Sequence, residues 1–136
     1  MSEYEHSRTM PALPEHIFDQ AGQVRRLDSW MPAELHVRAE KLPAVTVHED
    51  TTGEDAPALF RAQPERLRLE WGTRDGDSYA GWLQVADAGG GASEVTVHLS
   101  FFDERHDPGA ETVRSALEDS LERLEEQVRL HVENGG

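Results

Sequence analysis

One long amphipathic segment at the carboxyl end of the chain limits the folds open to this sequence. From Pro108 onward, with Asp107 as a potential helix cap, apolar residues recur at intervals of three or four, which places them on one side of an α-helix. They are Val113, Leu117, Leu121, Leu124, Val128 and Val132. No other long helix is written in the sequence, so only the preceding strands can cover this stripe. The sequence therefore predicts an α+β fold in which a curved antiparallel sheet of six or seven strands wraps around a C-terminal helix.

The rest of the chain supplies those strands. Residues 3–10 alternate in polarity and predict a first edge strand, followed by a short helix that begins at Pro14 and a second one over 23–29. Further segments with period-two alternation are 34–40, 45–48, a short strand at Phe60, 66–71, 79–85 and 95–101. We expect a polar, mobile loop over 49–57 and a glycine-rich hairpin connection over 87–93. No repeat or linker divides residues 1–136, which predicts one domain.

This order of elements is the helix-grip arrangement, and several motifs resemble the START-related superfamily, often called SRPBCC. The run 7–19, with Met10-Pro11-Ala12-Leu13-Pro14-Glu15, is similar to the family's opening strand and helix start. Trp30-Met31-Pro32, Trp71-Gly72 and Tyr79-Ala80-Gly81-Trp82 resemble its helix exit and middle strands. The resemblance covers nearly the whole chain and implies a fold rather than a reaction. Family members include lipid and hormone carriers, polyketide cyclases or dehydratases, and chaperone regulators.

Composition excludes several functions. Of 136 residues, 27 are acidic and 13 basic, and the net charge of −14 would repel nucleic acid and anionic membrane surfaces. The absence of cysteine excludes disulfides, thiolate metal ligands and thiol nucleophiles. No apolar run is long enough to span a membrane, and the acidic amino terminus lacks the pattern of a secretory signal. We therefore expect an acidic cytoplasmic protein.

The inward rows of the strands and the helix stripe predict a concave apolar interior. Either these side chains pack into a solid core, or they surround a hydrophobic cavity that binds a small apolar or amphipathic molecule, lipid-like or polyketide-like. Small residues at the inward positions Ala39, Ala62 and Gly81 favour a cavity. The candidate ligand-binding residues are Phe18, Trp30, Phe60, Leu69, Trp71, Tyr79, Leu83, Val97, Leu99, Phe101, Leu117 and Leu121.

The sequence gives less evidence for a metal, cofactor or catalytic site than for a ligand-binding interior. Seven histidines are present, but their spacing predicts no metal site, and nothing indicates a cofactor. The cluster over 103–107 has residue types found in catalytic loops, yet a solvated turn with a helix cap is the better explanation. If the chain is an enzyme of the cyclase or dehydratase type, Tyr79 is the residue able to donate a proton, with His6 as a distant partner. No catalytic residue is assigned, and a non-catalytic binding protein is the first hypothesis.

The outer face of the sheet suggests a third alternative. Trp82, His98 and Phe102 fall on its polar rows, on strands expected to be adjacent. Together they would form an aromatic patch suited to a homodimer or a protein partner, as in an interaction module of the chaperone-regulator type.

Overall fold

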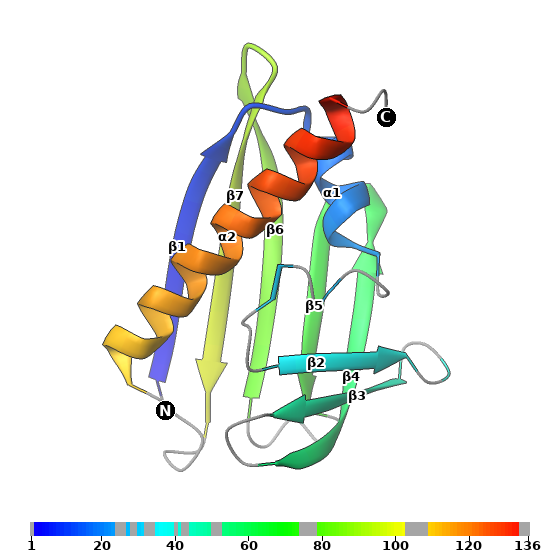
Figure 1. Cartoon of the computed structure of the whole chain (residues 1–136), viewed down its shortest axis with the longest axis vertical. Helices are drawn as coiled ribbons and strands as arrows, with labels where there is room; N and C mark the ends of the chain where they lie inside the picture. The colour runs from blue at the N-terminus through cyan, green and yellow to red at the C-terminus, as the bar shows by residue number, and fades with distance from the viewer. Residues whose placement is uncertain are drawn as a thin grey trace.

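A seven-stranded antiparallel sheet, with one long helix lying across it, makes up most of the computed structural model (Figure 1). The structure describes residues 2–23, 27, 30–31, 35–39, 41, 44–49, 53–73, 79–102 and 109–133. The strands are β1 (Ser2–Met10), β2 (Leu35–Ala39), β3 (Ala44–Glu49), β4 (Glu54–Gln63), β5 (Arg68–Thr73), β6 (Tyr79–Gly89) and β7 (Ala92–Phe101). The helices are α1 (Pro14–Ala21), the 3₁₀ turn η2 (Pro64–Arg66) and α2 (Ala110–Glu133). The predicted α+β helix-grip fold is confirmed.

The sheet order is β1-β7-β6-β5-β4-β3-β2, so β1 is an edge strand as predicted. A corner lies in β4, whose first half, Glu54–Leu59, pairs with β3, while its second half, Ala58–Gln63, pairs with β5. Beyond this corner, β2 and β3 run across the direction of β5, β6 and β7 (Figure 1). The sheet is therefore strongly curved, and α2 crosses its concave face.

The helix stripe is buried, as the sequence predicts. The side chains of Val113, Leu117, Leu121, Leu124 and Val128 are each at most 2% exposed. They join one hydrophobic core with the inward rows of the sheet and with Ile17, Phe18 and Ala21 of α1. The side chain of Val132 and the predicted cap at 107–108 lie outside the described residues. No helix in the described part of the chain is long and apolar enough to cross a membrane.

Two predicted segments are wrong. The loop expected over 49–57 is shorter in the structure, because Glu49 still belongs to β3 and pairs with Glu54, the first residue of β4. The expected strand over 66–71 begins late, because Pro64–Arg66 form η2 and Leu67 takes a left-handed φ of 52°. The amide of Val85 and the side chain of Gln84 both donate hydrogen bonds to the carbonyl oxygen of Leu67. Contacts from β6 thus hold a turn that local sequence does not indicate.

The glycine-rich connection is confirmed as a hairpin turn between β6 and β7. Gly89, Gly90 and Gly91 have φ values of 85°, 64° and 82°. Side chains with a Cβ rarely adopt this left-handed region, so glycine suits each position. The second predicted short helix, over 23–29, lies outside the described residues apart from Gln23 and a buried Leu27.

Candidate functional site

Four aromatic side chains gather on the concave face, at the end of the sheet where β1 begins and β7 ends. The ring of Phe101 lies 5.9 Å from that of Tyr4 in an edge-on arrangement and 5.2 Å from that of Tyr79. Trp71 Nε1 donates a 2.8 Å hydrogen bond to the hydroxyl oxygen of Tyr79. We call these four residues, Tyr4, Trp71, Tyr79 and Phe101, the aromatic group.

The aromatic group is partly buried, as are Val37, Val47 and Leu67, whereas the neighbouring inward residues of β6 and β7 are closed. Along β7, the exposed fraction is 0% at Val95, 2% at Val97 and 7% at Leu99, and Phe101 is only partly buried. Along β6, burial likewise decreases from Leu83 to Tyr79. The interior is therefore sealed at the α1 end of the sheet and becomes more accessible at the aromatic group.

The structure places the other predicted lining residues in the closed part of the interior. Each is at most 9% exposed and belongs to the same hydrophobic core: Phe18, Trp30, Phe60, Leu69, Leu83, Val97, Leu99, Leu117 and Leu121. The prediction that all twelve candidates face one interior therefore agrees with their burial. Their contact with a ligand stays a prediction.

The small residues do not open the interior in the way expected. Ala62 is exposed and lines no interior space. A Cβ on Gly81 would lie 2.6 Å from Trp71 Nε1, so the indole of Trp71 occupies the room that this glycine leaves. The side chain of Ala39 lies outside those described. Glycine at 81 thus admits the Trp71 ring to the concave face, where it reaches Tyr79.

Two buried donors in the interior have no hydrogen-bond partner in the described part of the chain. They are Trp30 Nε1 and Ser120 Oγ, on residues that are 2% and 1% exposed. Arg123, one helical turn after Ser120, donates from Nη2 to the carbonyl oxygens of Trp30 and Met31 and so ties that segment to α2. A buried donor left unpaired costs about 1–3 kcal/mol. An acceptor oxygen brought by a ligand would remove that cost.

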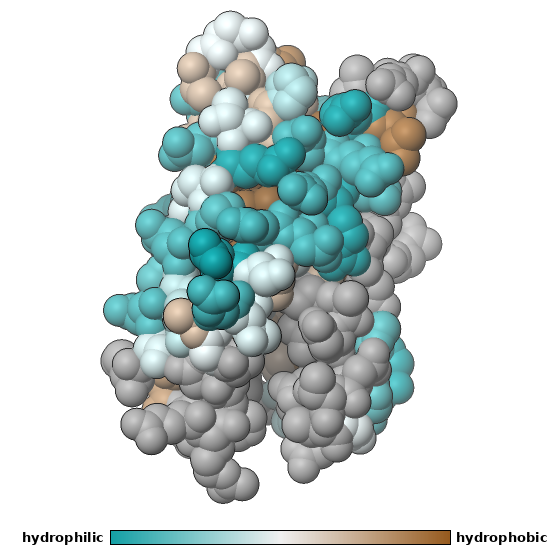
Figure 2. All heavy atoms as spheres, turned by 60° about the vertical axis from the view of Figure 1, so that its left-hand side comes forward, coloured by the Kyte–Doolittle hydropathy of each residue, from teal (hydrophilic) through white to brown (hydrophobic). Residues whose placement is uncertain are grey.

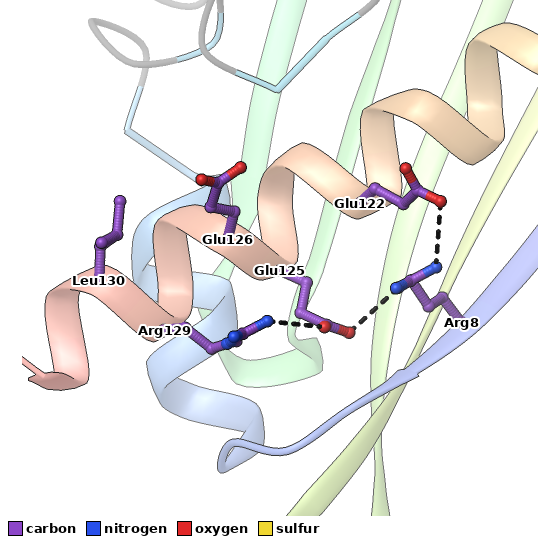
Figure 3. A pocket seen from close by; sticks show the side chains of 6 residues that line it. All are labelled: Arg8, Glu122, Glu125, Glu126, Arg129 and Leu130. Atoms are coloured by element: carbon purple, nitrogen blue, oxygen red, sulfur yellow. Dashed lines mark hydrogen bonds and ion pairs between the residues drawn. The ribbon is translucent and has the colours of Figure 1, made fainter.

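A separate hollow of about 310 Å³ lies between β1 and α2 (Figure 3). In it, Arg8 Nε is 3.0 Å from Glu125 Oε1, and Arg129 approaches the other oxygen of Glu125 at 3.7 Å. Glu122 lies 3.9 Å from Arg8. Hydrophilic side chains dominate the described part of this side of the molecule (Figure 2). Because the largely buried Glu125 already has two cationic partners, we interpret the hollow as an ionic clamp between β1 and α2.

The convex face holds two of the three residues of the predicted patch in direct contact. Trp82 and His98 are cross-strand neighbours whose rings stack at 5.1 Å with an interplanar angle of 6°. Phe102 follows β7 and is 41% exposed. No partner chain is shown for this face, so its role in an interface stays a prediction.

The remaining polar candidates do not assemble into a catalytic or metal site among the described residues. No three histidine or carboxylate side chains in this part of the chain are arranged to hold a metal ion. His48 of β3 pairs with Asp55 of β4 at 2.6 Å. The cluster over 103–107 lies outside the described residues.

Tyr4 is the residue of the aromatic group that the sequence-based candidate list lacks. Tyr4 lies in the segment 3–10, whose alternation predicts a strand, but which rings Tyr4 contacts depends on the register of that strand. Because Tyr4 pairs with Leu99, its ring lies beside that of Phe101, two residues along the same face of β7. Alternation alone gives the face of a residue but not its cross-strand neighbour.

Comparison with known proteins agrees with this geometry. Residues 1–129 match the family described as polyketide cyclase / dehydrase and lipid transport. The chain belongs to this family. No curated protein matches the sequence.

Solved structures similar to this chain include three that match nearly all of it. TTHA0849 from Thermus thermophilus has a TM-score of 0.73 at 20% identity, covering 96% of this chain and 99% of that one. The di-domain ARO/CYC proteins BexL, from the BE-7585A biosynthetic pathway, and StfQ, from the steffimycin pathway, have TM-scores of 0.70 and 0.71. Their identities are 16% and 15%; the alignments cover 96% of this chain and 47% and 46% of theirs. At these identities, the likeness shows the fold alone.

Proposed function

We propose that this chain binds a small apolar or amphipathic molecule between the sheet and α2, with the aromatic group as its point of entry. The observation that carries the proposal is the half-buried state of Tyr4, Trp71, Tyr79 and Phe101 at the end of the buried inward rows of β6 and β7. Aromatic faces that are in contact with one another but not covered by the core offer a ready surface for an apolar ligand.

The polar atoms of the interior favour a ligand that carries oxygen. Trp30 Nε1 can only donate a hydrogen bond, and Ser120 Oγ can donate one, so both suit a carbonyl or carboxyl oxygen. A lipid-like or polyketide-like molecule has such oxygens on an apolar frame. The family description, which names polyketide cyclases and lipid transport, supports the same chemical class.

The two tryptophans on opposite faces of the sheet provide a matched test. Trp71 belongs to the aromatic group, and Trp82 lies on the convex face. We expect the neutral dye N-phenyl-1-naphthylamine to bind the protein with increased fluorescence and to be displaced by a long-chain fatty acid. Trp71→Ala should weaken dye binding about tenfold, a loss of about 1.4 kcal/mol, while Trp82→Ala leaves the affinity unchanged.

Thermal melts of both variants report whether the fold is retained. A wild-type protein that binds neither the dye nor a panel of lipids would overturn the proposal. Equal loss of affinity in the two variants would also overturn it, since the site would then not lie on the concave face.

A second candidate function is catalysis of cyclisation or dehydration in the same interior. The fold similarity to two ARO/CYC proteins and the position of Tyr79 favour it. The hydrogen bond that Tyr79 accepts from Trp71 Nε1 polarises its own O–H, which makes the hydroxyl a better donor to a substrate oxygen. Such a donor contributes to proton transfer at a developing alkoxide.

Tyr79→Phe separates the two functions. If the chain is an enzyme, this variant should lower the turnover of a linear poly-β-ketone thioester at least about 100-fold, the usual scale for a general acid, with little change in dye affinity. Product formation followed by mass spectrometry gives the rate. An unchanged rate would remove Tyr79 from catalysis and leave the binding function as the simpler account.

A further inference from the structure

The convex face of the sheet carries a trough that the concave site does not explain. In the cross-strand register, Ser100 of β7 lies opposite Ala80 of β6, and Ala80 lies opposite Gly72 of β5. These three small residues form a low row across three strands. The adjacent row is His98, Trp82 and Glu70, which are much taller side chains. The low row is therefore the floor of a trough, and the tall row is its wall.

The floor is kept low by close packing. A Cβ on Gly72 would lie 2.9 Å from the carbonyl oxygen of Tyr79, so a larger residue would have to displace backbone. The resulting hollow has a volume of about 370 Å³. It is lined by Glu3, Glu70, Trp71, Ala80, Gly81, Trp82, His98 and Ser100.

The wall is held in place by its own contacts. The imidazole of His98 stacks on Trp82, and the Arg68 guanidinium lies 4.5 Å from the centre of the Trp82 ring. Arg68 Nε also donates a 2.8 Å hydrogen bond to Glu70, and His98 Nε2 contacts the hydroxyl of Ser100 at 3.2 Å. These contacts fix the side chains before any partner arrives, which reduces the entropic cost of binding.

The charges around the trough favour a cationic occupant. Glu3 stands at the β1 end with 62% of its side chain exposed, and Glu70 stands at the β5 end with 42% exposed. Arg68 pairs with Glu70, and His98 lies 3.4 Å from Glu3 and 3.2 Å from Glu5. Three carboxylates therefore border the trough against one guanidinium and one imidazole, so acidic groups are in excess. A second copy of this chain, with a net charge of −14, would be repelled. A basic partner would be attracted.

The length of the trough indicates a peptide. From β1 to β5 there are three strand spacings of about 4.8 Å, or roughly 14 Å in all. An extended segment covers that distance in about four residues. The hollow is partly open to solvent, whereas pockets for small molecules enclose most of the ligand. A chain anchored at both ends fits this shape better than a free amine.

We propose that this trough binds an extended basic segment of a protein partner, with one arginine or lysine at Glu3 and another about four residues away at Glu70. The apolar stems of these side chains lie along Ala80 and the edge of Trp82. The two rows of the trough lie on the convex face, opposite the ligand site proposed for the concave face, and Trp71 borders both.

A labelled heptapeptide with arginines at its second and sixth positions provides the probe, read by fluorescence anisotropy. A peptide of the same composition with its arginines adjacent is the control for charge alone. We expect the spaced peptide to bind more tightly, with an affinity that falls as salt rises. In an amide NMR spectrum with indole signals, the Nε1–H of Trp82 should shift, and that of Trp30 should stay.

Two pairs of variants test the site without disturbing the core. Ala80→Leu fills the floor and should weaken binding about tenfold, whereas Ala86→Leu, on the same face of β6 outside the trough, should leave it unchanged. Glu3→Gln should weaken binding two- to fivefold, on the scale of an exposed ion pair, and Glu94→Gln should not. Melting temperatures of all four variants confirm that they fold.

Several outcomes would overturn the proposal. If the two peptides bind equally, only the overall charge attracts them. If Ala80→Leu and Ala86→Leu behave alike, the trough is not the site. Equal binding of free spermidine at matched concentration would make the ligand a polyamine, and a dimer abolished by Ala80→Leu would make the trough a self-interface.

Discussion

At the scale of the residue, Gly81 and Trp71 determine the shape of the concave face together. The missing side chain at 81 lets the indole of Trp71 lie close against β6 and present Nε1 to Tyr79. The sequence shows a glycine among inward positions and invites the interpretation of empty space. The glycine is instead the place where an aromatic ring from the neighbouring strand packs.

Gly81→Ala should therefore destabilise the protein by about 1–2 kcal/mol, the typical cost of overpacking less the gain from restricting the unfolded chain. Urea denaturation gives the free energy of unfolding. In a Trp71→Leu background, the same substitution should cost nothing, because the atoms that the new Cβ would contact are gone. Equal costs in the two backgrounds would show that the strain lies in the backbone of β6.

At the scale of the element, the sequence predicts long regular segments well and short irregular ones poorly. The stripe of α2 extends over several turns with one period, and the alternation of β7 is uninterrupted. For both, the sequence therefore predicts the type of element and the side that faces the core. The start of β4 was missed because Glu54 to Pro57 are polar and include a proline. Among the described residues, Pro57 pairs with β3 and the pairing with β5 begins at Ala58, and such an edge position tolerates proline.

The candidate site shows the same limit. The burial of nine of the twelve predicted lining residues agrees with the sequence pattern. The contact of Tyr4 with Phe101 follows from register, which depends on how whole strands align. The stack of Trp82 on His98 and the left-handed Leu67 likewise depend on neighbouring strands. Sequence patterns give faces and elements, and tertiary pairing decides which side chains touch.

The ionic clamp between β1 and α2 leads to a prediction about how α2 is held. Arg8→Met keeps the aliphatic stem but removes the hydrogen bond to Glu125, whose side chain is only 16% exposed. We expect a loss of about 1–2 kcal/mol in the free energy of unfolding, in the range for hydrogen bonds to charged groups. Arg114→Met is the matched control. Its ion pair with Glu111 is largely exposed, and its loss should be within about 0.5 kcal/mol.

Should the two arginine variants unfold at the same urea concentration, the clamp contributes no more than an ordinary surface pair. The apolar stripe and the hydrogen bonds of Arg123 to Trp30 and Met31 would then be the contacts described that hold α2. Hydrogen exchange of the α2 amides offers an independent measure, because a loosened helix exchanges faster along its whole length.

At the scale of the whole molecule, the excess of acidic residues acts on stability as well as on partner choice. With 27 acidic and 13 basic residues, the compact state carries a self-repulsion that the expanded chain relieves. Ion pairs such as those of Arg8 and Arg68 offset a part of this repulsion. Salt screens both the repulsion and the ion pairs, and we expect the reduced repulsion to stabilise the protein more than the weakened ion pairs destabilise it.

Raising sodium chloride from about 20 mM to about 300 mM, which shortens the Debye length to below ~10 Å, should therefore raise the melting temperature by about 4 °C, or ~1 kcal/mol. Scanning calorimetry at fixed pH measures the shift. Replacing the exposed Glu118 and Glu126 by lysine should shrink this salt effect. A melting temperature that falls with salt in the wild-type protein would contradict the account and give the ion pairs the larger role.

The corner in β4 sets the angle between β2 and β3 and the rest of the sheet, and this angle can change. Within the described ranges, the wing formed by β2 and β3 is hydrogen-bonded to the rest of the sheet only through the first half of β4, while β1 and β5 to β7 form the block on which α2 rests. A change of bend at Ala58 and Leu59 would therefore move β2 and β3 as a unit relative to the rest of the sheet. Substitutions at these two positions would then change the size of the ligand that fits between the sheet and α2, while the packing of α2 on β1 and β5 to β7 stays the same.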